Sequence, residues 1–511
     1  MSKKKHIFLT MFISFLAVLL HCFISLYLTP KITNNVGVEA YGFVNLAKQF
    51  TSYGTIIMTA LNSYAARYMS VSYMQGRLNE YKRYYNTVLF GDLVIGGILF
   101  VIGLVCIINL EHLLQVPIDV LKDVKLLFFL TFLTFYFTTV STVFFTTGHV
   151  KDRLDIVNSI KGLSYVVEIL ILIFAYAFCR PTVWYVGLAT LAAALILFFG
   201  TAIMTKRLIP DSKIKVTLFD FASMRKLVVN GFWNAANSMG NALNTGLDLL
   251  VSNILLSALS MGQVSIAKTI NGMIYTLYST IAQPFQPAFL RKYSDNDLPG
   301  LIRELKYSMK VCGIITNVIF AGFCVLGLQF YKLWIPSQDT LLVHRLTVLA
   351  MLPCISEGCV YPLYYIYTLT VKNKVPCIIT IIGGLSNVLA MFLLIRFTDM
   401  GVYSIVVTTA VIMNVINFIT NPLYMCHCLR ISKKTFYPNI FLNVLCCGSA
   451  LVAMQLIVHF MPRNIGWGYF FLQVVVCTLA GATVQILIGF KPSEILQILK
   501  RLSSKLHIKR F

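Results

Sequence analysis

Two lysines occupy equivalent positions in a repeated stretch of this 511-residue chain, and each stands inside an apolar segment. Ala47-Lys48 recurs as Ala267-Lys268, at an offset of 220 positions. A lysine at mid-membrane depth costs about 2.5–3.5 kcal/mol on insertion scales, so its presence in both copies favours a functional role. We predict that the two amines face each other across a cavity and attract an anionic group. The alternative is that Lys48 is held in a buried ion pair, for example with Asp248.

The repeat continues beyond the lysines if a four-residue insertion is allowed. At an offset of 224, four residues match their counterparts: Arg67, Gly76, Glu80 and Lys82 correspond to Arg291, Gly300, Glu304 and Lys306. Repeats that carry charge or Gly/Pro breaks at matching depths indicate the binding site of a transporter. We place Arg67 and Arg291 at the cytoplasmic ends of the repeated helices. They serve there either as entrance ligands or as ordinary orienting charges.

Polar side chains recur at helical spacing within other apolar segments. The strongest stripe follows steps of three or four and shares one helical face: Asn230, Asn234, Asn237, Asn241, Asn244 and Asp248. Such residues can simply join helices through hydrogen bonds worth about 0.6–2 kcal/mol each. A stripe of this length instead favours a wet central cavity, because intramembrane polar residues face protein or water. We therefore predict substrate contacts from Asn237, Asn241, Asn244 and Gln283.

Acidic residues and prolines add two further expectations. Asp248 and Glu357 have no cation close by in sequence, and we predict that they bind a coupling proton or sodium ion. Glu168 lies two helical turns after Lys161, which indicates a structural pair. Pro284 and Pro287 remove backbone donors and predict a kink in their segment. No CxxC pair or His/Cys cluster has metal-ligand spacing, so no metal or cofactor is expected.

The elements that position these residues are membrane-spanning helices. The chain is 58% hydrophobic and 12% charged, against about a quarter charged in soluble proteins. Apolar runs long enough to cross a bilayer predict an all-α polytopic membrane protein with about 14 transmembrane helices. Their limits are 7–30, 37–65, 84–110, 124–147, 155–179, 182–205, 227–258, 262–290, 307–330, 341–370, 375–397, 401–425, 436–461 and 465–490.

The net charge of +23 comes from basic residues in short loops between apolar runs, as membrane topology requires. Nucleic-acid binding would instead require basic residues that follow a phosphate backbone. With a cytoplasmic N-terminus and alternating spans, 31 of the 42 Lys and Arg residues fall on the cytoplasmic side. This bias predicts that both termini are cytoplasmic. The plan is an N-terminal six-helix lobe (1–205), a cytoplasmic linker (206–226), a C-terminal six-helix lobe (227–430), two additional helices (431–490) and a basic tail (491–511).

An integral-membrane glycosyltransferase, polymerase or acyltransferase would need catalytic residues gathered on a large loop. The loops here are short and lack such a cluster, so we predict a protein that is not an enzyme.

The pattern Tyr41-Gly42-x-x-x-x-Ala47-Lys48, its echo before Lys268, and the basic loops that follow resemble the multidrug/oligosaccharidyl-lipid/polysaccharide (MOP) exporter superfamily. Within it the chain is most similar to the Wzx-type O-antigen and capsular polysaccharide flippases. The resemblance implies two lobes in a V-shaped, MATE-like arrangement that alternate between inward-open and outward-open states. Cationic cavity residues of the family correspond by position to Lys48, Lys268, Arg67 and Arg291.

The resemblance also implies a substrate, a compartment and partners. The substrate would be an oligosaccharide repeat unit on a polyprenyl diphosphate, moved from the cytoplasmic to the periplasmic leaflet of the bacterial inner membrane. The product would feed O-antigen, lipopolysaccharide or capsule assembly, with a glycan polymerase and glycosyltransferases as partners. A cation-coupled multidrug exporter of the same fold is the alternative. It would need an anionic cavity, whereas the deepest repeated charge here is lysine.

Overall fold

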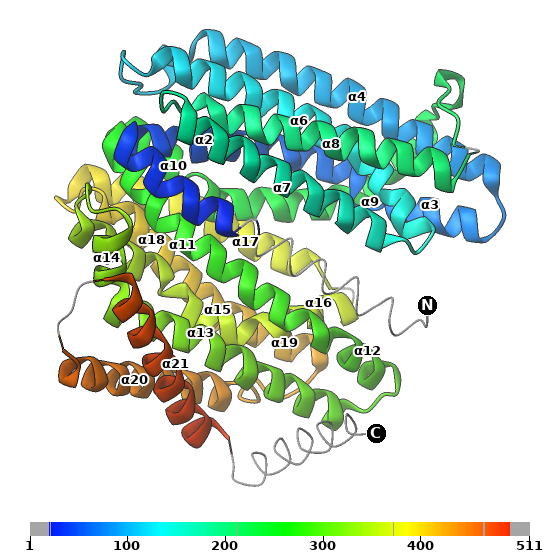
Figure 1. The fold of residues 1–511 in the computed structure, drawn as a ribbon. Helices are drawn as coiled ribbons and strands as arrows, with labels where there is room; N and C mark the ends of the chain where they lie inside the picture. The colour runs from blue at the N-terminus through cyan, green and yellow to red at the C-terminus, as the bar shows by residue number, and fades with distance from the viewer. Residues whose placement is uncertain (1–19, 21, 211, 371, 463–465, 491–511) are drawn as a thin grey trace, which may run out of the picture. The chain divides into compact units, whose positions relative to one another are not determined.

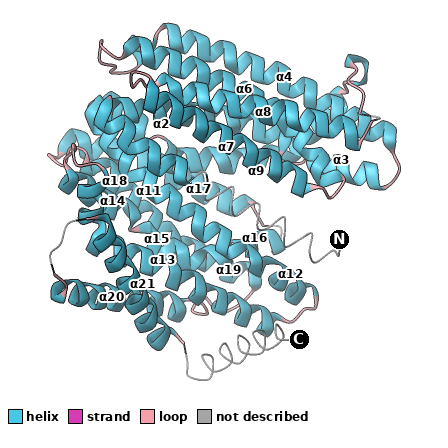
Figure 2. Ribbon diagram, in the orientation of Figure 1, coloured by secondary structure: helices cyan, strands magenta, loops and turns pink. Residues whose placement is uncertain are grey.

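The computed structural model of the chain describes residues 20–490 except 21, 211, 371 and 463–465. This described part consists of helices joined by short loops, and it contains no strand (Figures 1 and 2). The predicted all-α fold class is confirmed. The basic tail predicted at 491–511 lies outside the described residues.

Ten helical segments of the described part are long and apolar enough to cross a membrane. They correspond to the third to sixth and the ninth to fourteenth predicted spans, and they make the chain a multi-pass membrane protein. Their bounds are α4 (Leu78–Ile108), α6 (Leu121–Val150), α7 (Leu154–Phe178), α8 (Trp184–Leu208), α13 (Leu298–Trp334), α14 to α16 (Thr340–Thr370), α17 (Lys374–Phe397), α18 to α19 (Tyr403–Leu429), α20 (Tyr437–Phe460) and α21 (Trp467–Gly489).

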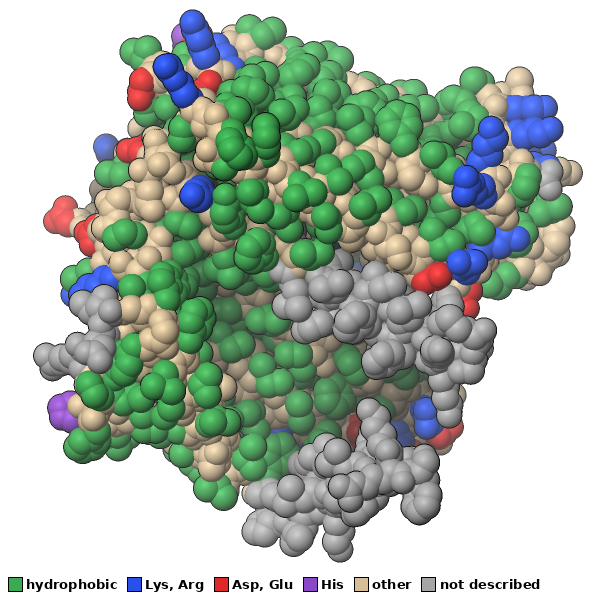
Figure 3. All heavy atoms as spheres, in the orientation of Figure 1, with side chains coloured by type: hydrophobic (Ala, Val, Ile, Leu, Met, Phe, Trp, Pro, Cys, Tyr) green, Lys and Arg blue, Asp and Glu red, His purple; other side chains and the backbone are tan. Residues whose placement is uncertain are grey.

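The outer faces of these helices are apolar, as contact with lipid requires. On α4, for example, Val94, Ile98, Val101 and Val105 are all more than half exposed. Figure 3 shows hydrophobic side chains over most of the visible face of α4, α6, α7 and α8, with Lys and Arg gathered near the helix ends. This distribution matches a bilayer that leaves the helix ends in water.

The other four predicted spans are the ones that carry polar side chains. The first, 7–30, begins outside the described residues, and residues 22–35 are helical. The remaining three are α2 (Val38–Asn62), the series α9 (Phe221–Asn241), η2 (Ala242–Gly246) and α10 (Asp248–Leu255), and α11 (Ala258–Ala282). They are absent from the ten apolar segments, since polar residues or breaks interrupt their apolar runs. The total of fourteen spans stays a prediction.

The helices form two compact units. The first comprises Met1–Ile266 and Thr380–Val402. Within it α6 packs against α4 and α8, α7 packs against α8, and α2 contacts both α6 and α9. Short elements complete this unit: α3 (Ala65–Met74), α5 (Leu110–Leu113) and η1 (Val216–Leu218).

The second unit comprises Ala267–Ile379 and Tyr403–Phe511, and α13 is its central helix. Helices α14 (Thr340–Met351), α15 (Pro353–Val360), α20 and α21 all contact α13. Buried amides fasten the two C-terminal helices, because Asn317 Nδ2 donates to Asn443 Oδ1 at 2.9 Å and to Gln485 Oε1 at 3.2 Å. Its other elements are η3 (Gln283–Phe285), α12 (Gln286–Ser294), η4 (Tyr361–Tyr364), α16 (Tyr365–Thr370), α18 (Tyr403–Val415), η5 (Ile416–Thr420) and α19 (Asn421–Leu429).

These contact units are not bounded by the predicted linker, since the first unit continues past it to Ile266. The predicted lobe boundaries at 205 and 226 therefore stay a prediction. In the structure the linker packs along α4. Asn86 Oδ1 accepts from the Lys215 backbone N–H at 2.8 Å, and Thr87 Oγ1 accepts from the Asp220 N–H at 3.0 Å.

The two copies of the repeat keep one register from end to end. Helices α2 and α11 begin at Val38 and Ala258, and α4 and α13 begin at Leu78 and Leu298, an offset of 220 in both cases. The turns before α4 and α13 repeat their backbone hydrogen bonds at the same offset. The bonds are Gln75 N to Val71 O and Arg77 N to Ser72 O in the first copy, and Asp295 N to Arg291 O and Asp297 N to Lys292 O in the second.

The predicted four-residue insertion is therefore wrong. The backbone turns through positive φ at Gly76 (72°) and at Asn296 (55°), so Gly76 corresponds to Asn296 and not to Gly300. Asn is among the non-glycine residues that best tolerate this left-handed conformation. Sequence matching missed the equivalence because the two letters differ. Arg67 and Arg291 are not equivalent, whereas Lys48 and Lys268 keep their correspondence.

The repeated helices touch at equivalent glycines. A Cβ on Gly42 would lie 3.0 Å from Gly262 Cα, and a Cβ on Gly262 would lie 2.3 Å from the Val38 carbonyl oxygen. One turn further on, Asn45 Nδ2 donates to Ser265 Oγ at 2.6 Å. These contacts join α2 and the start of α11 at equivalent positions of the two copies.

Candidate functional site

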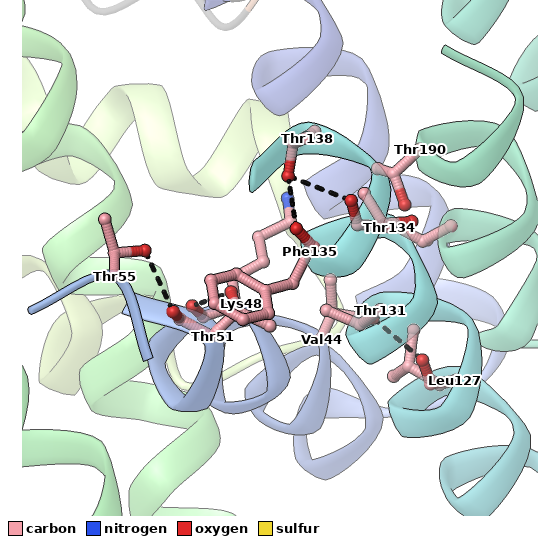
Figure 4. Close-up of a pocket in the computed structure, with 11 residues that line it drawn as sticks. Val44, Lys48, Thr51, Thr55, Leu127, Thr131, Thr134, Phe135, Thr138 and Thr190 are labelled. Atoms are coloured by element: carbon pink, nitrogen blue, oxygen red, sulfur yellow. Dashed lines mark hydrogen bonds between the residues drawn. The ribbon is translucent and has the colours of Figure 1, made fainter. Parts of the chain in front are cut away.

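Lys48 lines a cavity of about 190 Å³ inside the first unit (Figure 4). Helix α2 contributes Lys48, Thr51 and Thr55 to its wall, and α8 contributes Thr190. The remaining polar lining comes from α6: Thr131, Thr134 and Thr138. In Figure 4 the Lys48 side chain extends from α2 across the cavity toward α6. The predicted intramembrane amine thus faces a hollow lined with hydroxyl groups.

The electrostatic partner of Lys48 is Glu168 on α7, and the two side chains act on each other through their charges. Asp248 instead acts on Tyr53, so the proposed pairing of Lys48 with Asp248 is wrong. The pairing of Glu168 with Lys161 is also wrong, since the exposed Lys161 amine lies over the Tyr165 ring at 5.9 Å. Spacing along one helix could not reveal a partner that comes from another.

The asparagine stripe does not keep a single face through the fold. A π-helical turn at Ala242–Gly246 separates α9 from α10. Each residue advances the helix by about 100°, so the wider turn rotates the residues that follow it. Asn237 and Asn241 before the turn are exposed, whereas Asn244 and Asp248 are buried. Wide turns of this kind occur frequently at functional sites.

Within the π-helical turn, Asn244 is engaged with backbone groups. Its Nδ2 donates to the Gly240 carbonyl at 3.0 Å and to the Thr380 carbonyl at 2.7 Å. Its own carbonyl accepts from Asn387 Nδ2 at 2.7 Å. From α2, the Tyr53 hydroxyl donates to the Gly246 carbonyl at 2.6 Å. These bonds fix the shape of the wide turn, while Asn237 and Asn241 remain accessible.

In the second unit, α11 carries the half-buried Lys268 and ends where the prolines follow. The predicted break at Pro284 and Pro287 is confirmed, because α11 stops at Ala282, a 3₁₀ turn covers Gln283–Phe285, and α12 begins at Gln286. Gln283 is exposed at this break. A proline without a backbone N–H cannot continue the hydrogen-bond ladder of the helix.

Arg291 is exposed in the last turn of α12, near a loop that contains an ion pair. Lys292 Nζ lies 2.7 Å from Asp297 Oδ2, and the Gly300 N–H donates to Asp297 Oδ1 at 2.9 Å. These two donors lower the pKa of the Asp297 carboxyl, the Lys292 bond first. Asp297 also caps the start of α13, so this pair shapes the loop. In the first unit, Arg67 is exposed on α3.

Glu357 on α15 lies beside a cluster of tyrosines that the sequence pattern does not predict. The Tyr278 hydroxyl donates to its carboxylate. The Tyr278 ring lies 5.2 Å from that of Tyr275 and 5.4 Å from that of Tyr361, centroid to centroid. A carboxylate beside aromatic faces can hold a proton or a small cation. The tyrosines come from α11 and η4, so their meeting depends on tertiary packing.

The predicted residues divide between the two units. Lys48 and the asparagines of α9 and η2 belong to the first unit, whereas Lys268, Gln283, Arg291 and Glu357 belong to the second. The sequence does not identify the cavity threonines of the other helices, although Thr131, Thr134 and Thr138 share one face of α6 by spacing. That spacing was the available signal.

Comparison with known proteins identifies the fold. No protein-family model matches the chain. The chain is 27% identical over 424 residues to the uncharacterized membrane protein EpsK of Bacillus subtilis (strain 168), covering 83% of this chain and 84% of that protein. Among solved structures it is similar to the lipid II flippase MurJ in an inward-closed conformation, with a TM-score of 0.70 and 16% identity over 94% of this chain and 98% of MurJ.

Two further solved structures belong to the MOP superfamily. An inward-facing multidrug resistance MATE transporter gives a TM-score of 0.65 at 12% identity, covering 80% of this chain and 96% of that one. A transporter from Pyrococcus furiosus Vc1 (DSM3638), described by the reverse polarity of its binding pocket, gives 0.58 at 14% identity, covering 84% and 97%. The chain has the fold shared by MurJ and the MATE transporters.

Proposed function

We propose that this protein flips a polyprenyl-diphosphate-linked oligosaccharide repeat unit from the cytoplasmic to the periplasmic leaflet of a bacterial inner membrane. The product would enter surface polysaccharide assembly of the O-antigen, lipopolysaccharide or capsular type. The observation that carries the proposal is Lys48, an exposed amine at the wall of a polar cavity, set on a chain with a flippase-like fold. Transport proceeds by alternating access, and both termini are cytoplasmic.

The physical problem of such a substrate is its headgroup. A charged and hydroxylated group cannot enter hydrocarbon unaided, because burying unpaired charge and polar groups costs many kcal/mol. Amines, amides and hydroxyls along the path replace the hydration shell, while the polyprenyl tail stays in lipid. Lys48, Lys268, Arg67 and Arg291 are the cationic groups that we propose for this role. The accessible amides are Asn237, Asn241 and Gln283, while Asn244 holds the π-helical turn that follows Asn241.

A glycan polymerase and glycosyltransferases are the proposed partners, since they would consume and supply the lipid-linked unit. Asp248 and Glu357 are the proposed coupling-ion residues, with a proton or sodium as the ion. The Tyr278 hydrogen bond to Glu357 supports an exchangeable proton or cation at that carboxylate. No cofactor or metal takes part in this proposal.

The test is export of the surface glycan by lysine variants. Lys48→Ala and Lys268→Ala are expected to reduce export about tenfold or more each, since a hydrogen bond to a charged group is worth about 1.5–3 kcal/mol. Lys161→Ala is the matched control, because Lys161 is an exposed lysine in the first unit whose amine lies over a tyrosine ring. It should export normally. Membrane insertion is checked by immunoblotting. Wild-type export by the double lysine variant would reject the proposed role of the two lysines.

A multidrug exporter is the second candidate, and one observation favours it. Glu357 and its tyrosines form an acidic, aromatic cluster that suits an organic cation. Efflux of a fluorescent lipophilic cation from cells that carry the wild-type chain distinguishes the two functions. The exporter would be favoured if Glu357→Gln lost this efflux and glycan export did not depend on the chain.

A further inference from the structure

The cavity beside Lys48 has an unusual hydrogen-bonding character. All six of its threonines donate their hydroxyl protons to carbonyls three or four residues back on their own helices, with donor–acceptor distances of 2.7 to 3.0 Å. A hydroxyl whose proton is engaged still has lone pairs to accept with. The walls from Thr51, Thr55, Thr131, Thr134, Thr138 and Thr190 therefore offer acceptors to whatever occupies the cavity.

Lys48 supplies donors to the same space. Its ammonium carries three N–H groups, and within the described residues no hydrogen bond or ion pair occupies them. Acceptor oxygens surround a single donor group, which is the wrong arrangement for a phosphate or diphosphate. Such an anion needs several donors, and it would face threonine lone pairs instead.

The charges around the cavity also argue against a phosphate or diphosphate ligand. Glu168 acts on Lys48 from α7 through its charge and is itself buried, so the amine has a counter-charge within the unit. An amine with a nearby counter-charge attracts an anion only weakly, and it offers a cation no acceptor of its own. A neutral ligand with many hydroxyl groups fits both features. Its hydroxyls donate to the threonine oxygens, and one of its oxygens accepts from Lys48.

The size of the cavity limits the ligand to a single ring. Its volume of about 190 Å³ is below the range of about 300–1,000 Å³ that accommodates drug-sized ligands, yet it is far larger than one water needs. Apolar surface from Val44, Phe135 and Val186 completes the lining. An aromatic and aliphatic patch beside hydroxyl acceptors suits a sugar ring, which has apolar C–H faces and polar edges.

We propose that the threonine cavity is a monosaccharide subsite, in which a neutral sugar residue of the lipid-linked glycan donates to Thr134 and Thr138 and accepts from Lys48. This inference rests on the proposed function and refines it. Lys48 serves the sugar rather than the diphosphate, and the diphosphate binds to other cationic residues.

Binding of soluble probes to the purified full-length protein tests the subsite. The probes are methyl glycosides of neutral hexoses and N-acetylhexosamines, with methyl glucuronide and inorganic pyrophosphate for comparison. Ligand binding to the native state raises the unfolding temperature, and titration gives the affinity. At least one neutral glycoside is expected to bind at millimolar concentration. The variants Thr134→Val and Thr138→Val should each weaken its binding several-fold, and the pair about tenfold or more.

Thr146→Val is the matched control, because Thr146 lies on α6 and donates to the Thr142 carbonyl at 3.1 Å but does not line the cavity. It should bind the glycoside as the wild type does. The threonine variants should keep any stabilisation that pyrophosphate gives. The subsite would be overturned if the wild type bound no neutral glycoside. It would also be overturned if the Thr134/Thr138 double variant bound the glycoside as well as the wild type does, or if that variant lost pyrophosphate binding.

A parallel export assay separates this inference from the function on which it rests. If glycan export requires the chain but no neutral glycoside binds, the subsite is wrong and the flippase proposal stands. If a neutral glycoside binds through the threonines but export does not require the chain, the subsite stands as a sugar site and the flippase proposal fails.

Discussion

At the scale of single residues, the chemistry of the first unit centres on Lys48, which the sequence predicts, and on its neighbours in the cavity, most of which the sequence does not predict. An amine inside an apolar segment is visible in any reading of the chain, because its insertion cost is large. Glu168 on α7 and the cavity threonines of α6 and α8 come from other helices, so their approach to Lys48 depends on how those helices pack. The pairing of Lys161 with Glu168, inferred from spacing along one helix, was wrong for that reason, and the example of Asp248 as the partner of Lys48 was wrong as well.

The electrostatic coupling of Lys48 and Glu168 predicts non-additive stability. Glu168→Gln leaves the ammonium without its counter-charge, and Lys48→Met leaves a buried carboxylate, so each single variant should lower the unfolding temperature. The double variant removes both charges and should be more stable than the sum of the single effects predicts, by about 0.5–3 kcal/mol. Thermal unfolding of the four proteins in detergent measures this difference. Effects that add to within about 0.5 kcal/mol would contradict the coupling.

The coupling-ion residues make a separate prediction about energetics. If a proton or sodium ion binds at Asp248 or Glu357, Asp248→Asn or Glu357→Gln should remove the dependence of transport on the ion gradient. The neutral amide keeps the shape of the side chain but cannot balance a bound cation. Transport is measured with and without an ionophore, and Glu111→Gln serves as the control, since Glu111 pairs with Lys125 on the exposed surface. Gradient dependence unchanged in both variants would place coupling elsewhere.

At the scale of elements, the repeat was detected by its lysines but aligned incorrectly beyond them. Four identical residues match at an offset of 224, although the structure aligns the two copies at 220. The correct alignment pairs Gly76 with Asn296, which both have positive φ but differ in side chain. The break at Pro284 and Pro287 was predictable, since proline determines its own backbone conformation. The π-helical turns at Ala242–Gly246 and Ile416–Thr420 were not, because no residue type specifies them.

The glycine crossing of α2 and α11 predicts a strong positional contrast within one helix. Gly262→Ala would place a Cβ 2.3 Å from the Val38 carbonyl oxygen, whereas a Cβ on Gly272 meets nothing within 4 Å. Gly262→Ala should therefore lower the unfolding temperature by several degrees or reduce folded yield. Gly272→Ala should be neutral or stabilising by up to about 1 kcal/mol from helix propensity alone. Equal behaviour of the two variants would show that the crossing is not closely packed.

At the scale of the whole molecule, composition and apolar periodicity were sufficient to predict an all-helical, multi-pass membrane protein. Ten of the predicted spans appear as long apolar helices in the described part of the chain, and the four remaining are the polar ones. The polar residues that we propose for a transport path also weaken the apolar signal of a span. The fold shared with MurJ and the MATE transporters agrees with the resemblance drawn from Lys48 and its neighbours. Substrate identity depends on side-chain geometry that periodicity does not encode.

The most direct measurement is translocation by the purified protein in proteoliposomes that contain a polyprenyl-diphosphate-linked oligosaccharide in their inner leaflet. Access of the glycan to an added lectin reports its arrival on the outer leaflet. The account predicts that wild-type protein exposes the glycan far faster than protein-free vesicles do, and that the Lys48→Ala/Lys268→Ala variant does not. Exposure at the same rate with and without the wild-type protein would contradict it.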